Sequence, residues 1–413
     1  MAQNPYLSSQ LSRISRPSEQ LRSIVRLPGP FAELPRHPIL YNHPSPIHPL
    51  PSLSVNPQSP NHPRINIYAK REDHGSPLAC AGNKYRKLEY IVPDILSSTP
   101  TYHYHEHHPT TLKLDGPATI LVTEGAIQSN HTVQVAALAR TLGLKAIVLL
   151  SRGTGGGLRA SQNRDSFLRS GNVQINRLIG AEVRILNEGD PAAIDANPIL
   201  EELRASGERP YWIPGGASLH ALGGLGYARA AFEIEMQELE LNLEGSGRFD
   251  YIFVACGSGS TVGGLLAGFK LGETGPRQVI GVLNSPTKPR SYHADRVLSF
   301  ARRAAAQIGF DGNDRPNAEQ TIAMDDVRLE DRFVGTGYGV LDVETTEAMR
   351  IMAQSESIIL DPVYTAKVAR AMMHWVREDK IQEFARQRGL EDVNILFIHT
   401  GGQAALGAYA DVI

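Results

Sequence analysis

The sequence predicts an α/β fold built on parallel sheet. From residue 65 onward, short apolar runs alternate with longer segments that have helical spacing. Most of these runs are continuously hydrophobic, which is typical of strands covered on both faces. Strands that alternate with helices in this way pair in parallel. The candidate strands are 65–70, 118–123, 146–150, 182–186, 211–214, 251–255, 279–283 and 394–399, and the clearest helical segments are 132–142 and 191–205.

The amino-terminal part of the chain has a different composition. The first 26 residues contain four arginines and Glu19 as their only acid, which is typical of a mitochondrial targeting segment. Two prolines interrupt the helical period that such a signal requires, so we expect a cytoplasmic protein with a disordered or loosely docked extension over 1–27, and mitochondrial import is the alternative. Residues 28–64 hold 11 of the chain's 27 prolines and predict an extended strap that wraps the protein.

Charge and composition exclude several classes of protein. A total of 41 Lys and Arg against 43 Asp and Glu argues against a nucleic-acid partner. No run reaches the ~18 consecutive apolar residues of a membrane-spanning helix. Cys80 and Cys256 are too few for a disulfide framework and predict a reducing compartment. The segment 97–116 contains four histidines within six residues, but no further ligand follows at a recognisable spacing, so we expect a surface insertion and no metal.

The first chemical signal is a lysine at a strand-to-helix turn. The small-residue loop 79–82 leads to Asn83 and Lys84 at the start of a helix. An amine near the positive end of a helix dipole is less easily protonated and is a better nucleophile toward an aldehyde. Lys84 is therefore a candidate for a Schiff base, although a lysine that opens a helix is more often a solvated surface residue.

The second signal is a glycine- and serine-rich loop that follows the candidate strand 251–255. Its backbone N–H groups and hydroxyls, at a helix N-terminus, predict an anion site. The loop lacks the lysine of a nucleotide P-loop, and its glycine spacing misses the dinucleotide fingerprint by one residue. A phosphate without a nucleotide indicates pyridoxal phosphate, and a simple strand-to-helix turn is the alternative. The residues concerned are Gly257, Ser258, Gly259, Ser260 and Thr261.

The third signal is the stretch 123–132, which again follows a strand and precedes a helix. Consecutive amides at a helix N-terminus suit a substrate carboxylate, and a hydroxyl here lies at the carboxyl ends of the strands. An ordinary helix cap is the alternative. The candidate substrate-binding residues are Ser129, Asn130, His131 and Thr132.

Together these stretches resemble the fold-type-II pyridoxal-phosphate enzymes, and more narrowly the family of 1-aminocyclopropane-1-carboxylate deaminase and D-cysteine desulfhydrase. The resemblance covers residues 65 to 409. It implies a tryptophan synthase β-like fold with two open, twisted, mainly parallel sheets flanked by helices. The motifs that carry it, in the order of the family, are 81–90, 125–132, 171–174, 222–227, 257–261, 361–364 and 399–402.

The resemblance also implies residue roles. Lys84 matches the lysine that binds the cofactor and moves the Cα proton, and Asn130 matches the residue that hydrogen-bonds the cofactor's 3′-oxygen. Ser129 matches a substrate-loop serine, and Tyr338 and Tyr364 match two active-site tyrosines. Residues 257–261 match the phosphate loop.

Two positions separate the branches of this family. The deaminases have glutamate and leucine where this chain has Thr365 and Thr400. A carboxylate beside the pyridine nitrogen deepens the electron sink, whereas a threonine leaves that nitrogen neutral. The pair therefore favours a D-cysteine desulfhydrase, which would convert D-cysteine to pyruvate, ammonia and hydrogen sulfide. The alternatives are 1-aminocyclopropane-1-carboxylate deaminase, a non-catalytic pyridoxal-phosphate-binding protein and a dinucleotide-dependent oxidoreductase.

The motif order predicts two domains. We expect residues 65–85 and 214–413 to form a large cofactor-binding domain and residues 86–213 to form a small α/β domain, with the cofactor between them. The resemblance also implies a homodimer.

Overall fold

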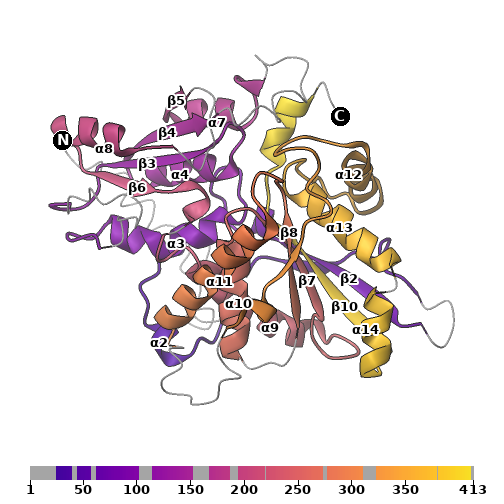
Figure 1. Ribbon diagram of the computed structural model, residues 1–413. Helices are drawn as coiled ribbons and strands as arrows, with labels where there is room; N and C mark the ends of the chain where they lie inside the picture. The colour runs from indigo at the N-terminus through magenta and orange to yellow at the C-terminus, as the bar shows by residue number, and fades with distance from the viewer. Residues whose placement is uncertain are drawn as a thin grey trace.

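The computed structural model describes residues 25–39, 44–56, 62–101, 114–151, 167–186, 194–218, 220–272, 277–309, 322–378 and 380–410 (Figure 1). The amino-terminal extension up to residue 24 and residues 102–113 of the His-rich segment lie outside these ranges. Within the described part of the chain, no helix combines the length and apolar character needed to cross a membrane.

The larger sheet has six strands in the order β1-β2-β10-β7-β8-β9. Strands β2, β10, β7, β8 and β9 are parallel, and β1 from the proline-rich strap pairs antiparallel with β2 at one edge. This sheet draws its strands from both ends of the chain, because β10 pairs with β2 along its whole length. The strands are β1 (Ile47–Pro49), β2 (Arg64–Arg71), β7 (Tyr251–Cys256), β8 (Gln278–Leu283), β9 (Arg328–Glu330) and β10 (Asp392–His399).

The smaller sheet has four parallel strands in the order β5-β4-β3-β6. All four lie between residues 120 and 213, so we propose the same domain division as the sequence indicates. In Figure 1 this sheet lies beside the larger one, with α4, α7 and α8 around it. The strands are β3 (Ile120–Ala126), β4 (Lys145–Ser151), β5 (Glu182–Leu186) and β6 (Pro210–Ile213).

Helices cover both faces of the larger sheet. Alternate residues of β7 show this, because Tyr251 and Phe253 join a core cluster with α12, α13 and α14, whereas Ile252 and Val254 join another with α9, α10 and α11. Continuous hydrophobicity along β7 thus reflects burial on both sides. The helices are α2 (Gly29–Ala32), α3 (Lys84–Ile95), α4 (Asn130–Thr141), α7 (Asn172–Ile179), α8 (Asn197–Ala205), α9 (Leu225–Leu241), α10 (Ser260–Gly272), α11 (Arg290–Gln307), α12 (Val343–Glu356), α13 (Thr365–Arg377) and α14 (Lys380–Arg388).

Short 3₁₀ turns complete the described elements. They are η2 (Glu72–His74), η4 (Gly215–Ala217), η6 (Met324–Asp326) and η7 (Gln403–Tyr409). Of these, η4 follows the end of β6 and η7 follows the end of β10, so both lie at carboxyl ends of strands, where ligands bind in open α/β sheets.

The predicted α/β class with mainly parallel sheets is confirmed, and all eight candidate strands form. Strands β1 and β9 were missed because each has only three residues. Within 191–205, helix α8 begins at Asn197 and not earlier, and residues 191–193 lie outside the described ranges.

Small residues bring α9 and α10 unusually close together. A Cβ at Gly264 would lie 2.3 Å from the Gly224 carbonyl oxygen, and one at Gly268 would lie 2.3 Å from that of Ala228. Glycine is therefore required at both positions, since a side chain would push the helices apart. This close packing fixes the start of α10, where the predicted phosphate loop ends.

Candidate active site

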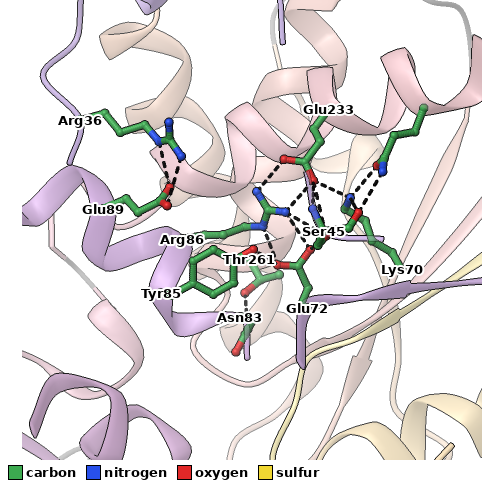
Figure 2. Close-up of polar contacts among 11 residues, drawn as sticks. Arg36, Ser45, Lys70, Glu72, Asn83, Tyr85, Arg86, Glu89, Glu233 and Thr261 are labelled. Atoms are coloured by element: carbon green, nitrogen blue, oxygen red, sulfur yellow. Dashed lines mark hydrogen bonds and ion pairs between the residues drawn. The ribbon is translucent and has the colours of Figure 1, made fainter. Parts of the chain in front are cut away.

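Lys84 is the first residue of α3, and the chain just before it is fixed from two directions. The Asn83 side-chain amide donates to Thr261 Oγ1 at 3.2 Å (Figure 2), and the Asn83 backbone N–H donates to the Thr400 carbonyl at 3.1 Å. Gly82 has φ +153°, and a Cβ there would lie 2.6 Å from the same carbonyl. The lysine is thus held between the start of α10 and the end of β10.

A second lysine, Lys87, lies one helical turn after Lys84 and is fully buried. Burial and the neighbouring charge of Lys84 hold the pKa of Lys87 well below its ordinary value. Burial also lowers the pKa of Lys84 to about 8, although a hydrogen bond with Lys87 and the charge of Asp361 oppose the shift. Near neutral pH a useful fraction of Lys84 is the free amine, which is the nucleophilic form. Sequence analysis missed Lys87, although the i, i+3 spacing puts both amines on one helix face.

The glycine- and serine-rich loop joins β7 to α10 beside these lysines. Ser258 Oγ and Ser260 Oγ lie 3.1 Å apart. Ser260 Oγ and Lys87 Nζ both donate to the Gly216 carbonyl, at 3.4 and 3.1 Å. A Cβ at Gly216 would lie 3.0 Å from Ser258 Cβ, so the turn η4 closes tightly over the loop. Hydroxyls, a helix N-terminus and a buried amine together form an anion site.

The two predicted tyrosines lie together next to Lys84. The hydroxyls of Tyr338 and Tyr364 are hydrogen-bonded to each other, and Lys84 Nζ is 6.0 Å from the centroid of the Tyr364 ring. Burial raises the pKa of Tyr364 to about 12 and raises the pKa of Tyr338 well above its ordinary value. Both phenols are therefore protonated at physiological pH and can donate hydrogen bonds. Tyr409 holds the segment that contains Tyr338, because the Tyr409 hydroxyl donates to the Gly339 carbonyl at 2.7 Å.

The start of α4 carries the predicted substrate-binding residues. Ser129 precedes the helix, Asn130 is its first residue, and both are buried. Burial and the charges of Lys84 and Lys87 hold the pKa of His131 well below its ordinary value, so this imidazole is neutral. The Thr132 hydroxyl donates to the Ser129 carbonyl at 2.9 Å. The backbone N–H groups of the first turn of α4 remain free of intrahelical partners, so they are the donors that we propose for a substrate carboxylate.

Thr365 begins α13, and Asp361 engages its hydroxyl. Thr365 Oγ1 donates to Asp361 Oδ1 at 2.7 Å and accepts the Asp361 N–H at 2.7 Å. Asp361 also accepts the backbone N–H groups of residues 363, 364 and 365, so it holds the turn that leads into the helix. The contact of Thr365 with the cofactor stays a prediction, and the structure adds that Asp361 orients its hydroxyl. The Thr400 carbonyl positions Asn83, as described above.

Comparison with known proteins decides the family. Residues 39–401 match the family model described as pyridoxal-phosphate dependent enzyme. The chain belongs to this family.

Relatives in this family share most of the chain. A 1-aminocyclopropane-1-carboxylate deaminase of Burkholderia vietnamiensis is 35% identical over 380 residues, covering 92% of this chain and 97% of the relative. The deaminase of Methylobacterium sp. is 36% identical over 383 residues, covering 92% and 98%. A crystal structure of an ACC deaminase homologue has a TM-score of 0.68 and 28% identity, covering 92% and 96%. The fold-type-II architecture and the pyridoxal-phosphate cofactor are thereby confirmed. The homodimer stays a prediction, and nothing supports mitochondrial import.

The residues present fit pyridoxal phosphate. The cofactor has a phosphate, an aldehyde and an aromatic ring, and the site offers an anion loop at Gly216 and Ser258, the amine of Lys84 and the tyrosine pair. A Cβ at Gly257 would lie 3.8 Å from Tyr364 Cε1, so the anion loop and the tyrosines adjoin each other. We propose that these residues hold the cofactor.

The pKa of Lys84 predicts how the apoprotein captures the cofactor. Only the free amine attacks an aldehyde, so the capture rate should rise roughly tenfold between pH 7 and 9, with a midpoint near 8. Stopped-flow absorbance after mixing apoprotein with pyridoxal phosphate measures this rate. N-acetyl-lysine amide is the control for titration of the cofactor itself, and its rate should keep rising to about pH 10.4. If the capture rate of the protein depended on pH in the same way as that of N-acetyl-lysine amide, this would contradict the lowered pKa of Lys84.

Proposed function

We propose that this chain is a pyridoxal-phosphate-dependent enzyme that converts a small amino acid to a 2-oxo acid and ammonia, with 1-aminocyclopropane-1-carboxylate as its substrate. The observation that carries this proposal is 35–36% identity over more than nine-tenths of the chain to proteins named for that deaminase. The reaction consumes one water and yields 2-oxobutanoate and ammonia. Sequence analysis placed this activity second.

The chain's own residues supply binding and proton transfer. Pyridoxal phosphate, when bound, withdraws electrons from the bonds at the substrate's α-carbon. Lys84 binds the cofactor and, when released from it, acts as a base through its amine. The first turn of α4, with Ser129, orients the substrate carboxylate through backbone N–H groups. Tyr338 and Tyr364 donate hydrogen bonds. This pair also supplies a proton to the substrate carbon that becomes basic during the reaction.

A second candidate is D-cysteine desulfhydrase, and a specific observation favours it. Thr365 puts no carboxylate at the start of α13, and the carboxylate of Asp361 is engaged by the backbone N–H groups of residues 363 to 365. Elimination of sulfide from Cβ needs a weaker electron sink than the opening of a ring without an α-hydrogen. In that reaction Lys84 removes the α-proton, and D-cysteine with water gives pyruvate, ammonia and hydrogen sulfide.

A panel of substrates decides between the two proposals. The purified holoprotein is supplied with 1-aminocyclopropane-1-carboxylate, D-cysteine, L-cysteine and β-chloro-D-alanine, and the 2-oxo acids are quantified. The first proposal expects kcat/KM for the cyclopropane acid to exceed that for D-cysteine by at least about tenfold. The reverse ratio supports the desulfhydrase. Absence of any 2-oxo acid from a protein with the visible cofactor band would support a non-catalytic binding protein.

The double variant Thr365→Glu/Thr400→Leu is the matched test of the residues that separate the branches. If these positions set the electron sink, the variant should raise the ratio of cyclopropane to D-cysteine turnover by about tenfold or more. An unchanged ratio in a folded, cofactor-loaded variant would show that neither position selects the substrate.

A further inference from the structure

Asn172, the first residue of α7, is fully buried and makes three hydrogen bonds to the start of α4 and the loop before it. Its backbone N–H donates to Gln128 Oε1 at 3.0 Å. Its side-chain nitrogen donates to the Gln128 carbonyl at 2.9 Å and to Asn130 Oδ1 at 2.7 Å. Sequence analysis placed Asn172 in a family motif but assigned it no role.

These contacts determine which way the amide of Asn130 faces. The Gln128 carbonyl only accepts hydrogen bonds, so the Asn172 atom next to it is the amide nitrogen. The same nitrogen lies next to the end of the Asn130 side chain, where a second amide nitrogen would repel it. Asn130 therefore turns its oxygen toward Asn172 and its NH₂ group in the other direction.

The surroundings keep this arrangement rigid. Gln128 Nε2 donates to the Phe167 carbonyl at 2.7 Å, which fixes the side chain that receives the Asn172 N–H. Gly171 has φ +60°, and a Cβ there would lie 2.5 Å from Gln128 Oε1. On the far side, a Cβ at Gly402 would lie 2.6 Å from Asn130 Nδ2, so the NH₂ group lies directly against the chain after β10.

We propose that Asn172 is a positioning residue, which holds the Asn130 amide so that its NH₂ group donates a hydrogen bond to the ring oxygen of pyridoxal phosphate. The inference rests on the proposed function, and it takes from the family resemblance that Asn130 faces this oxygen. It adds that the direction of the amide is set from α7, 42 residues away in the chain.

The test is the pH titration of the bound cofactor's visible absorption in Asn172→Asp. A carboxylate at 172 attracts the NH₂ group of Asn130, and the ring oxygen loses its donor. A hydrogen bond to a charged oxygen favours the deprotonated chromophore, so its loss should raise the midpoint by about one pH unit. Asn172→Ala removes the donor without adding charge. It should shift the midpoint in the same direction, and it serves if the aspartate variant does not fold.

Asn176→Asp is the matched control. Asn176 is equally buried on α7 and donates to the Asn172 carbonyl at 3.0 Å and to Thr132 Oγ1 at 3.2 Å. We expect Asn176→Asp to lose about as much thermal stability as Asn172→Asp but to keep the wild-type midpoint. An equal spectral shift in Asn176→Asp, or no shift in either Asn172 variant, would overturn the proposal.

A double-mutant cycle tests whether Asn172 acts through Asn130. Asn130→Ala should raise the midpoint by itself, and the uncharged change Asn172→Ala should then add nothing, since no amide is left to turn. If the double variant shifts further than Asn130→Ala, and the wild type has the expected visible band, the inference is overturned but the proposed function is not. A wild-type protein without a visible band would overturn the proposed function, and this inference with it.

Discussion

Replacing Lys84 with alanine should remove the borohydride-reducible adduct between protein and pyridoxal phosphate and lower turnover about a thousandfold or more. The expected effect is large because one amine both binds the aldehyde and moves the proton. We expect Lys87 not to take its place, because its amine is directed to the Gly216 carbonyl, to which it donates at 3.1 Å. Peptide mass mapping after borohydride reduction locates the adduct, and the release of 2-oxo acid gives the turnover.

Two further lysine variants separate the covalent role of Lys84 from general effects. Lys145 is exposed and pairs with Glu208 at the surface, so Lys145→Ala should keep both adduct and turnover. Lys87→Met should keep the adduct on Lys84 but retain the cofactor less well, because the anion loop loses a buried amine. A reduced adduct on Lys87 in the wild type, or a visible band that survives in Lys84→Ala, would refute the assignment.

The features that the sequence predicts well are encoded locally. Eight strands form at the apolar runs of the sequence, because each run is long enough to indicate by itself a buried strand. Lys84 opens α3 as expected, because the loop and the helical period that follow it are contiguous. The glycine- and serine-rich loop could be predicted for the same reason: its chemistry depends on the dihedral freedom and hydroxyls of neighbouring residues.

Contacts between distant segments could not be predicted in this way. Nothing in the residues around Asn130 indicates that Asn172 lies against it, because the pairing depends on how α4 and α7 pack. The hydrogen bond from the Thr365 hydroxyl to Asp361, four residues earlier, was likewise not predicted from the sequence. An aspartate commonly accepts the N–H groups of the residues that follow it in a turn, and this local signal could have been used.

The largest stability effect is expected at a buried cluster of four charged side chains, Lys70, Glu72, Arg86 and Glu233 (Figure 2). Arg86 Nε donates to Glu72 Oε2 at 2.5 Å, and Arg86 Nη2 donates to Glu233 Oε1 at 2.7 Å. Lys70 Nζ contacts the same Glu233 oxygen at 2.6 Å, and all four side chains are at most 4% exposed. Two cations balance two carboxylates, so the cluster is neutral only while it is complete. It connects α3, β2, η2 and α9.

Arg86→Met should lower the free energy of unfolding by about 3–5 kcal/mol, because it leaves two buried carboxylates with one cation. Chemical denaturation of wild type and variant at neutral pH measures the difference. Arg350→Met makes the same change at an exposed pair with Glu347 and should cost at most about 0.5 kcal/mol. Equal losses in the two variants would contradict the role of burial.

The cost of removing the Glu233 carboxylate should depend on whether Arg86 is present. Glu233→Gln in the Arg86→Met background should cost less than it does in wild type, since the carboxylate it removes has already lost its main partner.

Acid should have a similar effect, because protonation also removes the charge of this carboxylate. Burial alone would raise the pKa of Glu233, but the charges of Arg86 and Lys70 outweigh it and hold the pKa below its ordinary value of 4.5. The wild-type advantage over Arg86→Met is therefore complete above pH 4.5 and should shrink as the pH falls below it, because protons then bind the unfolded chain more readily than the folded one. Purely additive losses, or an advantage that does not change with acid, would mean that Arg86 stabilises α3 by packing and not by charge.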